Sequence, residues 1–136
     1  MKDMHSNISV LHAITPQAVG TSGIAGGKLS GILDRQGYES VEFVFQAGAS
    51  ASVADTVVPV IYEAAATGDS FTSVADADLL GTEAGSTLTL TAAKSGRIGY
   101  RGSKRYLKIR LYGVGHATGI VGAVAILGNP ALAPVA

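Results

Sequence analysis

The feature that most constrains the fold is a two-residue alternation of apolar and polar side chains, which recurs along much of the chain. It is clearest in residues 106–112, where Leu107, Ile109 and Leu111 alternate with tyrosine, lysine and arginine. Successive side chains of a β-strand point to opposite faces of the sheet, so this pattern predicts a half-buried strand. The same pattern predicts further strands at 41–46, 57–62 and 86–91, and the apolar run at 120–127 predicts another.

Glycine-containing turns separate the predicted strands at intervals of roughly ten residues, a spacing typical of β-sandwiches and jelly rolls. A helical pattern is confined to residues 74–80, and Gly81 would end it. We therefore predict an all-β fold, an antiparallel and jelly-roll-like β-sandwich. Within it, Pro59 favours an edge position for its strand, and residues 120–127, apolar on both faces, predict a central or covered strand.

The N-terminal part differs from the rest of the chain. Residues 1–19 predict an extended arm that contains Pro16, and a glycine-rich stretch follows it. The sequence thus divides into an arm and glycine-rich linker, residues 1–30, and a single β-sandwich domain, residues 31–136. An extended arm can add a strand to the open edge of a neighbouring sheet.

Composition indicates a protein with a partner. Charged residues make up 15% of the chain, against roughly 25% in an average soluble domain, so we expect part of the surface to be buried by association. Cysteine is absent, which excludes disulfides and thiolate metal sites and leaves oligomerisation to support a small core. Residues 1–12 lack the apolar run of a signal peptide, and no stretch has about 18 consecutive apolar residues, so we expect cytosolic synthesis and no membrane partner.

The charges are segregated by sign, although they sum to zero. Every charged residue from 39 to 83 is acidic, and every one from 94 to 110 is basic. One interpretation is that the acidic half faces a basic strand pair within one fold. The other is a dipolar subunit whose basic face meets an acidic neighbour, since complementary fields orient partners.

The histidines give little support for catalysis. His5 and His12 lie in the predicted arm, and His116 lies in a glycine-rich loop. An enzyme requires a positioned acid, base, nucleophile or metal, and no serine or aspartate partner for His116 is implied by spacing.

Two other motifs also fail as ligand sites. Gly27-Lys28 precedes Leu29 rather than the serine or threonine of a phosphate loop, and no helix pattern follows. Asp76 and Asp78 lack the ligand spacing of a calcium loop, so an acidic turn is the better interpretation. We therefore predict no enzymatic activity, no cofactor and no metal.

The basic segment, residues 97–110, is interleaved with tyrosines, a combination that can grip single-stranded nucleic acid. Acidic residues elsewhere and a pI near 6.8 argue against nucleic-acid binding, because such domains are usually strongly basic. A hairpin that docks on protein is the preferred interpretation.

Four segments together resemble a known family: residues 32–38 (ILDRQGY), 75–83 (ADADLLGTE), 98–109 (IGYRGSKRYLKI) and 124–130 (VAILGNP). They resemble the capsid cement (decoration) proteins of tailed bacteriophages, with Bordetella-type short-tailed phages as the nearest case. The pattern IGY-x-G-x-KRY is the most distinctive, and the resemblance spans residues 31–134. The arm lies outside it.

The resemblance implies a structural protein on the outer surface of the virion capsid, which binds the major capsid protein and itself and resists internal DNA pressure. A homodimer is favoured over a homotrimer. The alternative function is a receptor- or glycan-binding module on the virion. The predicted capsid or self-association contacts are Arg97, Tyr100, Arg101, Lys104, Arg105, Tyr106, Lys108, Arg110, Tyr112, Pro130, Leu132 and Pro134.

Overall fold

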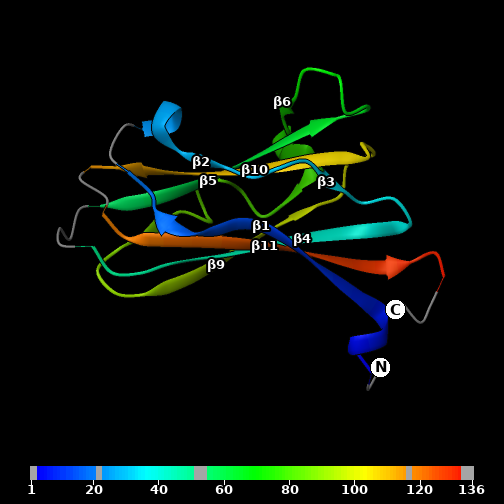
Figure 1. The fold of residues 1–136 in the computed structure, drawn as a ribbon, viewed down its shortest axis with the longest axis horizontal. Helices are drawn as coiled ribbons and strands as arrows, with labels where there is room; N and C mark the ends of the chain where they lie inside the picture. Colours follow the sequence, from blue (N-terminus) through cyan, green and yellow to red (C-terminus); the bar gives the residue numbers. More distant parts are fainter. Residues whose placement is uncertain (1–2, 21–22, 51–54, 116–117, 133–136) are drawn as a thin grey trace.

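The computed structural model describes residues 3–20, 23–50, 55–115 and 118–132, which form two antiparallel β-sheets packed face to face (Figure 1). Sheet A has the order β1 (Ile8–Ala18), β11 (Ile120–Pro130), β4 (Tyr38–Ala47), β9 (Lys94–Tyr100) and β7 (Leu79–Leu80). Sheet B has the order β2 (Lys28–Leu29), β10 (Tyr106–Val114), β5 (Thr56–Ala64) and β6 (Thr72–Ser73). Two short strands complete sheet B: β3 (Leu33–Asp34) beside β10, and β8 (Leu88–Thr89) beside β5.

The core lies between the sheets and consists of the inward positions that the alternation predicts. On β10, Leu107, Ile109 and Leu111 are at most 1% exposed. On β4, Phe43 and Phe45 face them from the other sheet and are equally buried. The predicted antiparallel, jelly-roll-like β-sandwich is therefore confirmed.

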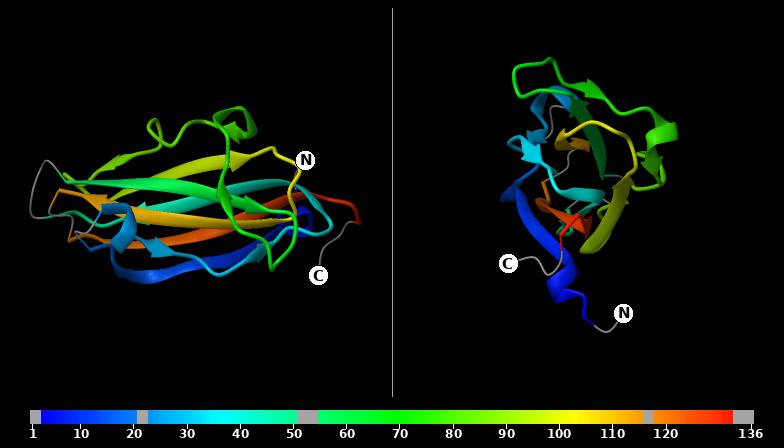
Figure 2. Two further views of the ribbon diagram at one scale, coloured as in Figure 1. Left: turned by 90° about the horizontal axis from the view of Figure 1, so that it is seen from above. Right: turned by 90° about the vertical axis from the view of Figure 1, so that its right-hand side faces the viewer.

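Several consecutive strands alternate between the two sheets, as the end-on view in Figure 2 shows. The chain passes from β4 to β5, from β9 to β10 and from β10 to β11 by crossing from one layer to the other. Residues that are close in sequence are thus placed on opposite sides of the molecule.

The predicted arm is a strand of the sandwich. β1 is extended, as expected, but it pairs with β11 along most of its length, from Ile8 opposite Gly128 to Ala18 opposite Ile120. β2 likewise pairs with β10. Residues 8–18 and 28–29 are therefore strands of the same two sheets as the rest of the described chain. The apolar side chains Ala13 and Ile14 explain this, because they are buried in the core.

Three local expectations also need correction. Residues 74–80 form only the short 3₁₀ turn η3 (Asp76–Asp78) before β7, and Gly81 follows with a φ of 97°. Residues 94–96, a glycine-containing stretch of the kind expected to form a turn, are instead the start of β9, because they pair with β4. The strand expected at 86–91 is reduced to β8, although Leu88 and Leu90 are buried as predicted.

Of the two strand positions predicted from single features, the central one is confirmed, and the edge position expected for the strand of Pro59 is wrong, because β5 lies between β10 and the short strands β6 and β8. β11 is central in sheet A, between β1 and β4. On the side away from β10, β5 is paired only at its two ends, by the short strands β6 and β8. Pro59 lies between these two short pairings. Ile61, two residues on, points its N–H the same way, and the Glu83 carboxylate accepts it at 3.3 Å. Proline therefore removes no ladder hydrogen bond to β10.

Ser30 joins β2 to β3 along the other edge of sheet B. It is 6% exposed, and its Oγ accepts the N–H of Ile109 at 3.0 Å where the strand ladder is interrupted. Its own N–H is donated to the Ile109 carbonyl at 2.8 Å. A side chain thus replaces a backbone acceptor, and the buried amide of Ile109 stays satisfied.

Candidate interaction surfaces

The predicted basic hairpin is not a hairpin, because β9 belongs to sheet A and β10 to sheet B. Its residues are divided among several places. Arg97 lies on the outer face of sheet A, opposite Val44 in the ladder, while Tyr106, Lys108, Arg110 and Tyr112 are half-buried on the outer side of β10. Arg101, Lys104 and Arg105 lie in the connection between the sheets, Pro130 and Leu132 lie at the far end of β11, and Pro134 is outside the described residues.

Arg35 fixes the connection between β9 and β10. Its Nε donates to the Lys104 carbonyl at 2.6 Å, and its Nη2 donates to the Gly102 carbonyl at 2.9 Å. Beside it, Arg105 makes a two-pronged ion pair with Asp34, with N–O distances of 2.7 and 2.8 Å. This ion pair lowers the pKa of the Asp34 carboxyl. The basic connection is therefore held in one conformation by bonds within the chain.

Tyr100, predicted as a contact residue, is instead part of the core and only 1% exposed. Its hydroxyl donates to Glu63 Oε2 at 2.5 Å and accepts the N–H of Lys104 at 2.9 Å. Because Tyr100 is on sheet A and Glu63 on sheet B, the bond joins the two layers. Burial, and then the Glu63 carboxylate, raise the pKa of the Tyr100 hydroxyl.

Cations lie over aromatic rings on sheet B and its surroundings. Lys108 Nζ is 4.1 Å from the centroid of the Phe71 ring, and the Arg110 guanidinium is 5.6 Å from that of Tyr62. The Arg105 guanidinium covers Tyr106 at 4.9 Å. Each of these rings thus has one face occupied by a cation, which leaves less of it for stacking against a ligand.

Sheet B's outer side also carries positive charge that no carboxylate balances at short range. Among the described residues, the ion pairs within 4 Å are Arg105–Asp34 and Arg97–Glu42. Arg110 donates from Nη1 to the Ile24 carbonyl at 3.1 Å, but its Nε is buried without a hydrogen-bond partner. A carbonyl contact orients the guanidinium but does not neutralise its charge. Lys108 and Arg110 therefore make the outer side of sheet B basic.

Sheet A has an apolar outer face, which the sequence analysis did not single out. We define the apolar face as Val10, Val44, Leu80, Val124 and Ile126. Val124 and Val44 are direct cross-strand neighbours on β11 and β4, and Val10 and Ile126 are neighbours on β1 and β11. Val10 is 56% exposed and Leu80 55%. The sequence feature that could have predicted this face is that residues 120–127 are apolar on both faces of their strand.

One ion pair lies within the apolar face, because Glu42 is opposite Ile126 and Arg97 is opposite Val44. Glu42 and Arg97 approach to 3.7 Å, and their side chains are 33% and 81% exposed respectively. Burial raises the pKa of the Glu42 carboxyl, while the charge of Arg97 opposes that rise. Glu42 is thus partly desolvated even before any partner binds.

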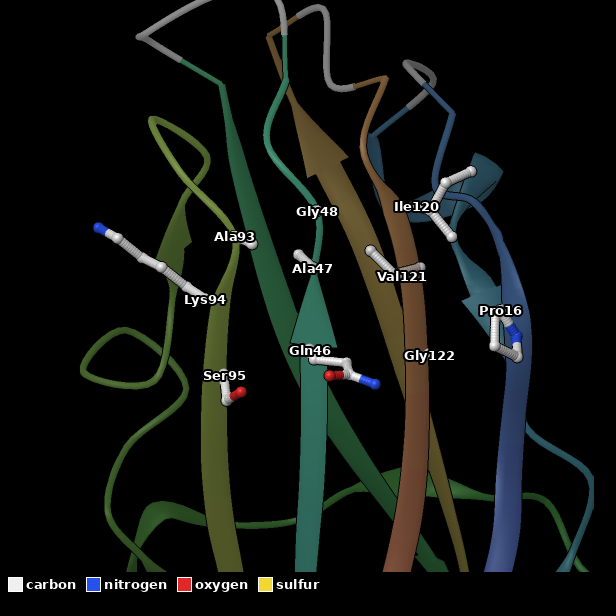
Figure 3. Close-up of a pocket in the computed structure, with 10 residues that line it drawn as sticks. All are labelled: Pro16, Gln46, Ala47, Gly48, Ala93, Lys94, Ser95, Ile120, Val121 and Gly122. Atoms are coloured by element: carbon white, nitrogen blue, oxygen red, sulfur yellow. The ribbon is translucent and has the colours of Figure 1, made fainter.

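A groove crosses the outer face of sheet A next to the apolar face (Figure 3). It consists of two adjoining hollows of about 370 and 240 Å³. Both hollows share Pro16 of β1, Gly122 of β11, Gln46 of β4 and Ser95 of β9. Gly122 has no side chain, so the central strand forms the floor of the groove. We call it the sheet A groove.

Chemistry-bearing residues do not assemble into a recognisable reaction site in the part of the chain that the structure describes. No group of three or more His, Asp or Glu side chains there could hold a metal ion. His12 Nε2 lies 3.1 Å from Thr15 Oγ1, His5 is in the 3₁₀ turn η1 (His5–Asn7), and His116 lies outside the described residues. Ser50 donates its hydroxyl to the buried Asp55 carboxylate and accepts the Thr118 N–H at 3.2 Å, which ties loops together at one end of the sandwich.

No described helix has the length and apolarity needed to cross a bilayer. This finding concerns helices of the described residues only.

Neither a protein-family model nor a curated protein matches the sequence. Solved structures do share the fold. The SPBc2 prophage-derived protein YomS aligns with a TM-score of 0.50 at 12% identity, over 90% of this chain and 94% of that one. The Clostridium thermocellum xylanase Xyn10B, a CBM22-1 and GH10 module pair solved with xylohexaose, aligns with a TM-score of 0.50 at 10% identity, over 98% of this chain and 28% of that one. At such identities the likeness establishes the β-sandwich fold.

Proposed function

We propose that this chain is a structural virion protein of a tailed phage, which binds the outer surface of the capsid and cements neighbouring major capsid protein subunits. The observation that carries the proposal is the apolar face of sheet A. An antiparallel sheet with one face in the core usually presents polar residues on the other. Here Val44, Val124 and Ile126 occupy the outer face of the two central strands, where a protein partner would bury them.

The basic surface of sheet B supports the same proposal. Lys108 and Arg110 face outward without carboxylates at short range, and Lys104 in the neighbouring connection is exposed. Such a surface attracts an acidic partner and sets its orientation, with a contribution to encounter rate that salt weakens. We propose that it faces acidic patches of the major capsid protein.

The phage assignment has two supports. Four sequence segments resemble capsid cement proteins, and the sandwich shares its fold with a prophage-derived protein. Weak contacts repeated with the symmetry of a capsid add up to tight binding overall. Self-association, as a homodimer or a homotrimer, belongs to the same proposal, and so do the absence of enzymatic activity and of a cofactor.

The alternative is a glycan-binding module, since a structure that contains a CBM22 module shares the fold. Sugar rings are usually bound against open aromatic faces or in polar clefts. Tyr62, Phe71 and Tyr106 each have a cation over one face, and the apolar face of sheet A contains no aromatic side chain. The observed surfaces therefore favour a protein partner.

Sedimentation with empty phage capsids tests the proposal. The protein should pellet with the capsids and saturate at a fixed, symmetry-compatible ratio to the major capsid protein. Val124→Glu should reduce the bound fraction, whereas Thr89→Glu, an equal charge change at an exposed position of β8 away from Lys108 and Arg110, should bind like the wild type. Urea denaturation establishes that both variants fold.

Absence of pelleting at every salt concentration would overturn the cement proposal. Binding to isolated bacterial surface polysaccharide in the same assay would then support the glycan-binding alternative. Equal binding by Val124→Glu and the wild type would instead remove the apolar face from the contact.

A further inference from the structure

We propose that the sheet A groove binds the apolar segment 130–136 of a second copy of this chain. The inference concerns contact between copies and does not depend on binding to a capsid. It assigns an occupant to the groove and a role to a segment whose Leu132 is 87% exposed.

The groove has the dimensions of a short extended segment. It crosses four neighbouring strands, on which Pro16, Gly122, Gln46 and Ser95 succeed one another (Figure 3). Three strand spacings of about 4.8 Å give a length of about 14 Å. At about 3.3 Å per residue, four to five extended residues span that length.

The segment has the composition of such an occupant. Residues 130–136 read PALAPVA and carry no charged side chain. Ala131 still donates its N–H to the Gly37 carbonyl at 2.8 Å, but Leu132, next in the chain, is 87% exposed. An exposed leucine beside two alanines and two prolines gains from being covered.

Proline content favours a groove on a sheet face over a sheet edge. Pro130 already pairs with Tyr38 at the end of β11, and Pro134 has no N–H to donate, so residues 132–136 are poorly suited to complete a strand ladder, whereas backbone carbonyls can still accept hydrogen bonds. Gln46, Ser95 and Lys94 line the groove and bring amide, hydroxyl and ammonium donors to it. No carboxylate lines either hollow, so carbonyl groups entering it meet no negative charge.

The contact must be between copies. Along β11, Pro130 lies six residues beyond Val124 and ten beyond Ile120, the two ends of the groove on that strand. At about 3.4 Å per residue these separations are about 20 and 34 Å. Residues 131–136, fully extended, span at most about 20 Å, so they would end where their own groove begins. The segment of a second molecule has no such restriction.

Two variants distinguish the molecule that supplies the segment from the molecule that supplies the groove. Deletion of residues 132–136 removes the segment and leaves the groove open. Gly122→Leu fills the groove and leaves the segment intact. A Cβ at Gly122 has its nearest neighbours, Pro16 Cγ and the Ile14 carbonyl oxygen, at 3.4 and 3.5 Å, which is ordinary contact, so the fold should tolerate the change. Gly31→Leu is the matched control, because a Cβ there meets nothing within 4 Å.

Analytical ultracentrifugation gives the decisive comparison. We expect the wild type and Gly31→Leu to associate, and each of the two test variants to associate at least roughly tenfold more weakly, as for loss of a central contact. An equimolar mixture of the deletion variant and Gly122→Leu should form a one-to-one complex, because one supplies the groove and the other the segment. A labelled peptide of residues 130–136 should bind the deletion variant and not Gly122→Leu.

If either variant alone associates as strongly as the wild type, the inference is overturned. A mixture of the two variants that stays monomeric would also overturn it. These results are independent of the capsid assay. Binding between copies without capsid pelleting leaves the inference standing and removes the cement proposal, and capsid pelleting without binding between copies does the reverse.

Discussion

Tyr100→Phe tests the bond that joins the two sheets. The substitution keeps the ring, which is buried and lies under the Arg35 guanidinium at 5.3 Å, and removes only the hydroxyl. That hydroxyl donates to the Glu63 carboxylate and accepts the Lys104 N–H. Phenylalanine therefore breaks both bonds without creating a cavity of any size.

The expected loss of unfolding free energy follows from the two bonds. A hydrogen bond to a charged group contributes about 1.5–3 kcal/mol and a neutral one about 0.5–1.5 kcal/mol, so the sum is roughly 2–4 kcal/mol. For a chain of this size, each kcal/mol lowers the melting temperature by about 2–4 °C. We expect the midpoint to fall by about 4–16 °C, with sheet content unchanged by circular dichroism.

Alkaline pH provides an independent check of the same bond. The pKa of Tyr100 is raised in the folded protein, so its contribution to stability is complete below its unfolded pKa of about 10 and is lost as the pH rises above that value. The loss is about 1.4 kcal/mol per pH unit. Phenylalanine does not titrate, so the stability difference between the two proteins should narrow between pH 9 and 11.

Urea denaturation at several pH values measures both effects. A difference in unfolding free energy below about 0.5 kcal/mol at pH 8 is smaller than the contribution of a single neutral hydrogen bond. Such a result would refute the conclusion that the Tyr100 hydroxyl stabilises the packing of the two sheets. A difference that stays constant from pH 9 to 11 would refute the assigned direction of its pKa shift.

Three further predictions concern single sites. Gly96→Ala should lower the unfolding free energy by about 1–3 kcal/mol, because its Cβ would lie 2.7 Å from the Phe45 ring; chemical denaturation measures this, and wild-type stability would contradict it. Glu42→Gln should raise the unfolding free energy at pH 7, because burial raises the pKa of the Glu42 carboxyl and its charged form is unfavourable in the folded protein. The gain should shrink towards pH 4, where the wild-type carboxyl becomes protonated in the folded protein. Denaturation at both pH values measures the sign of the stability difference. Ser30→Ala should cost about 1–3 kcal/mol by leaving the Ile109 N–H without its acceptor, and amide hydrogen exchange at Ile109 should accelerate while distant core amides keep their relative order of protection.

Prediction from sequence was most successful for strand identity and least successful for which strands are neighbours. The alternation in residues 106–112 depends only on the two-residue period of a strand, and Leu107, Ile109 and Leu111 are buried accordingly. By contrast, the hairpin predicted for residues 97–110 does not exist, because β9 and β10 lie in different sheets. Neighbours in sequence usually pair, but nothing local distinguishes a turn within a sheet from a crossing between sheets.

The predicted contact residues show the same division. Their types were identified by composition and charge, and Lys108, Arg110 and Leu132 do lie where a partner could reach them in part. Tyr100 is instead buried against Glu63, a partner far away in sequence. The positions of the acceptors for Arg35 and Arg105 could not be predicted either, since each lies on a segment brought near only by folding.

By itself, the sequence determined the all-β class, the inward faces of the long strands that it predicted and the exclusion of disulfides, because each depends on the chemistry of a few consecutive residues. Only the tertiary structure decided that residues 8–18 form a strand of the sandwich, that the basic segment is divided between two layers, and that sheet A has an apolar outer face with a groove over Gly122. These features depend on strand order and register. Strand order and register result from the packing of the whole core and are not encoded in any single segment.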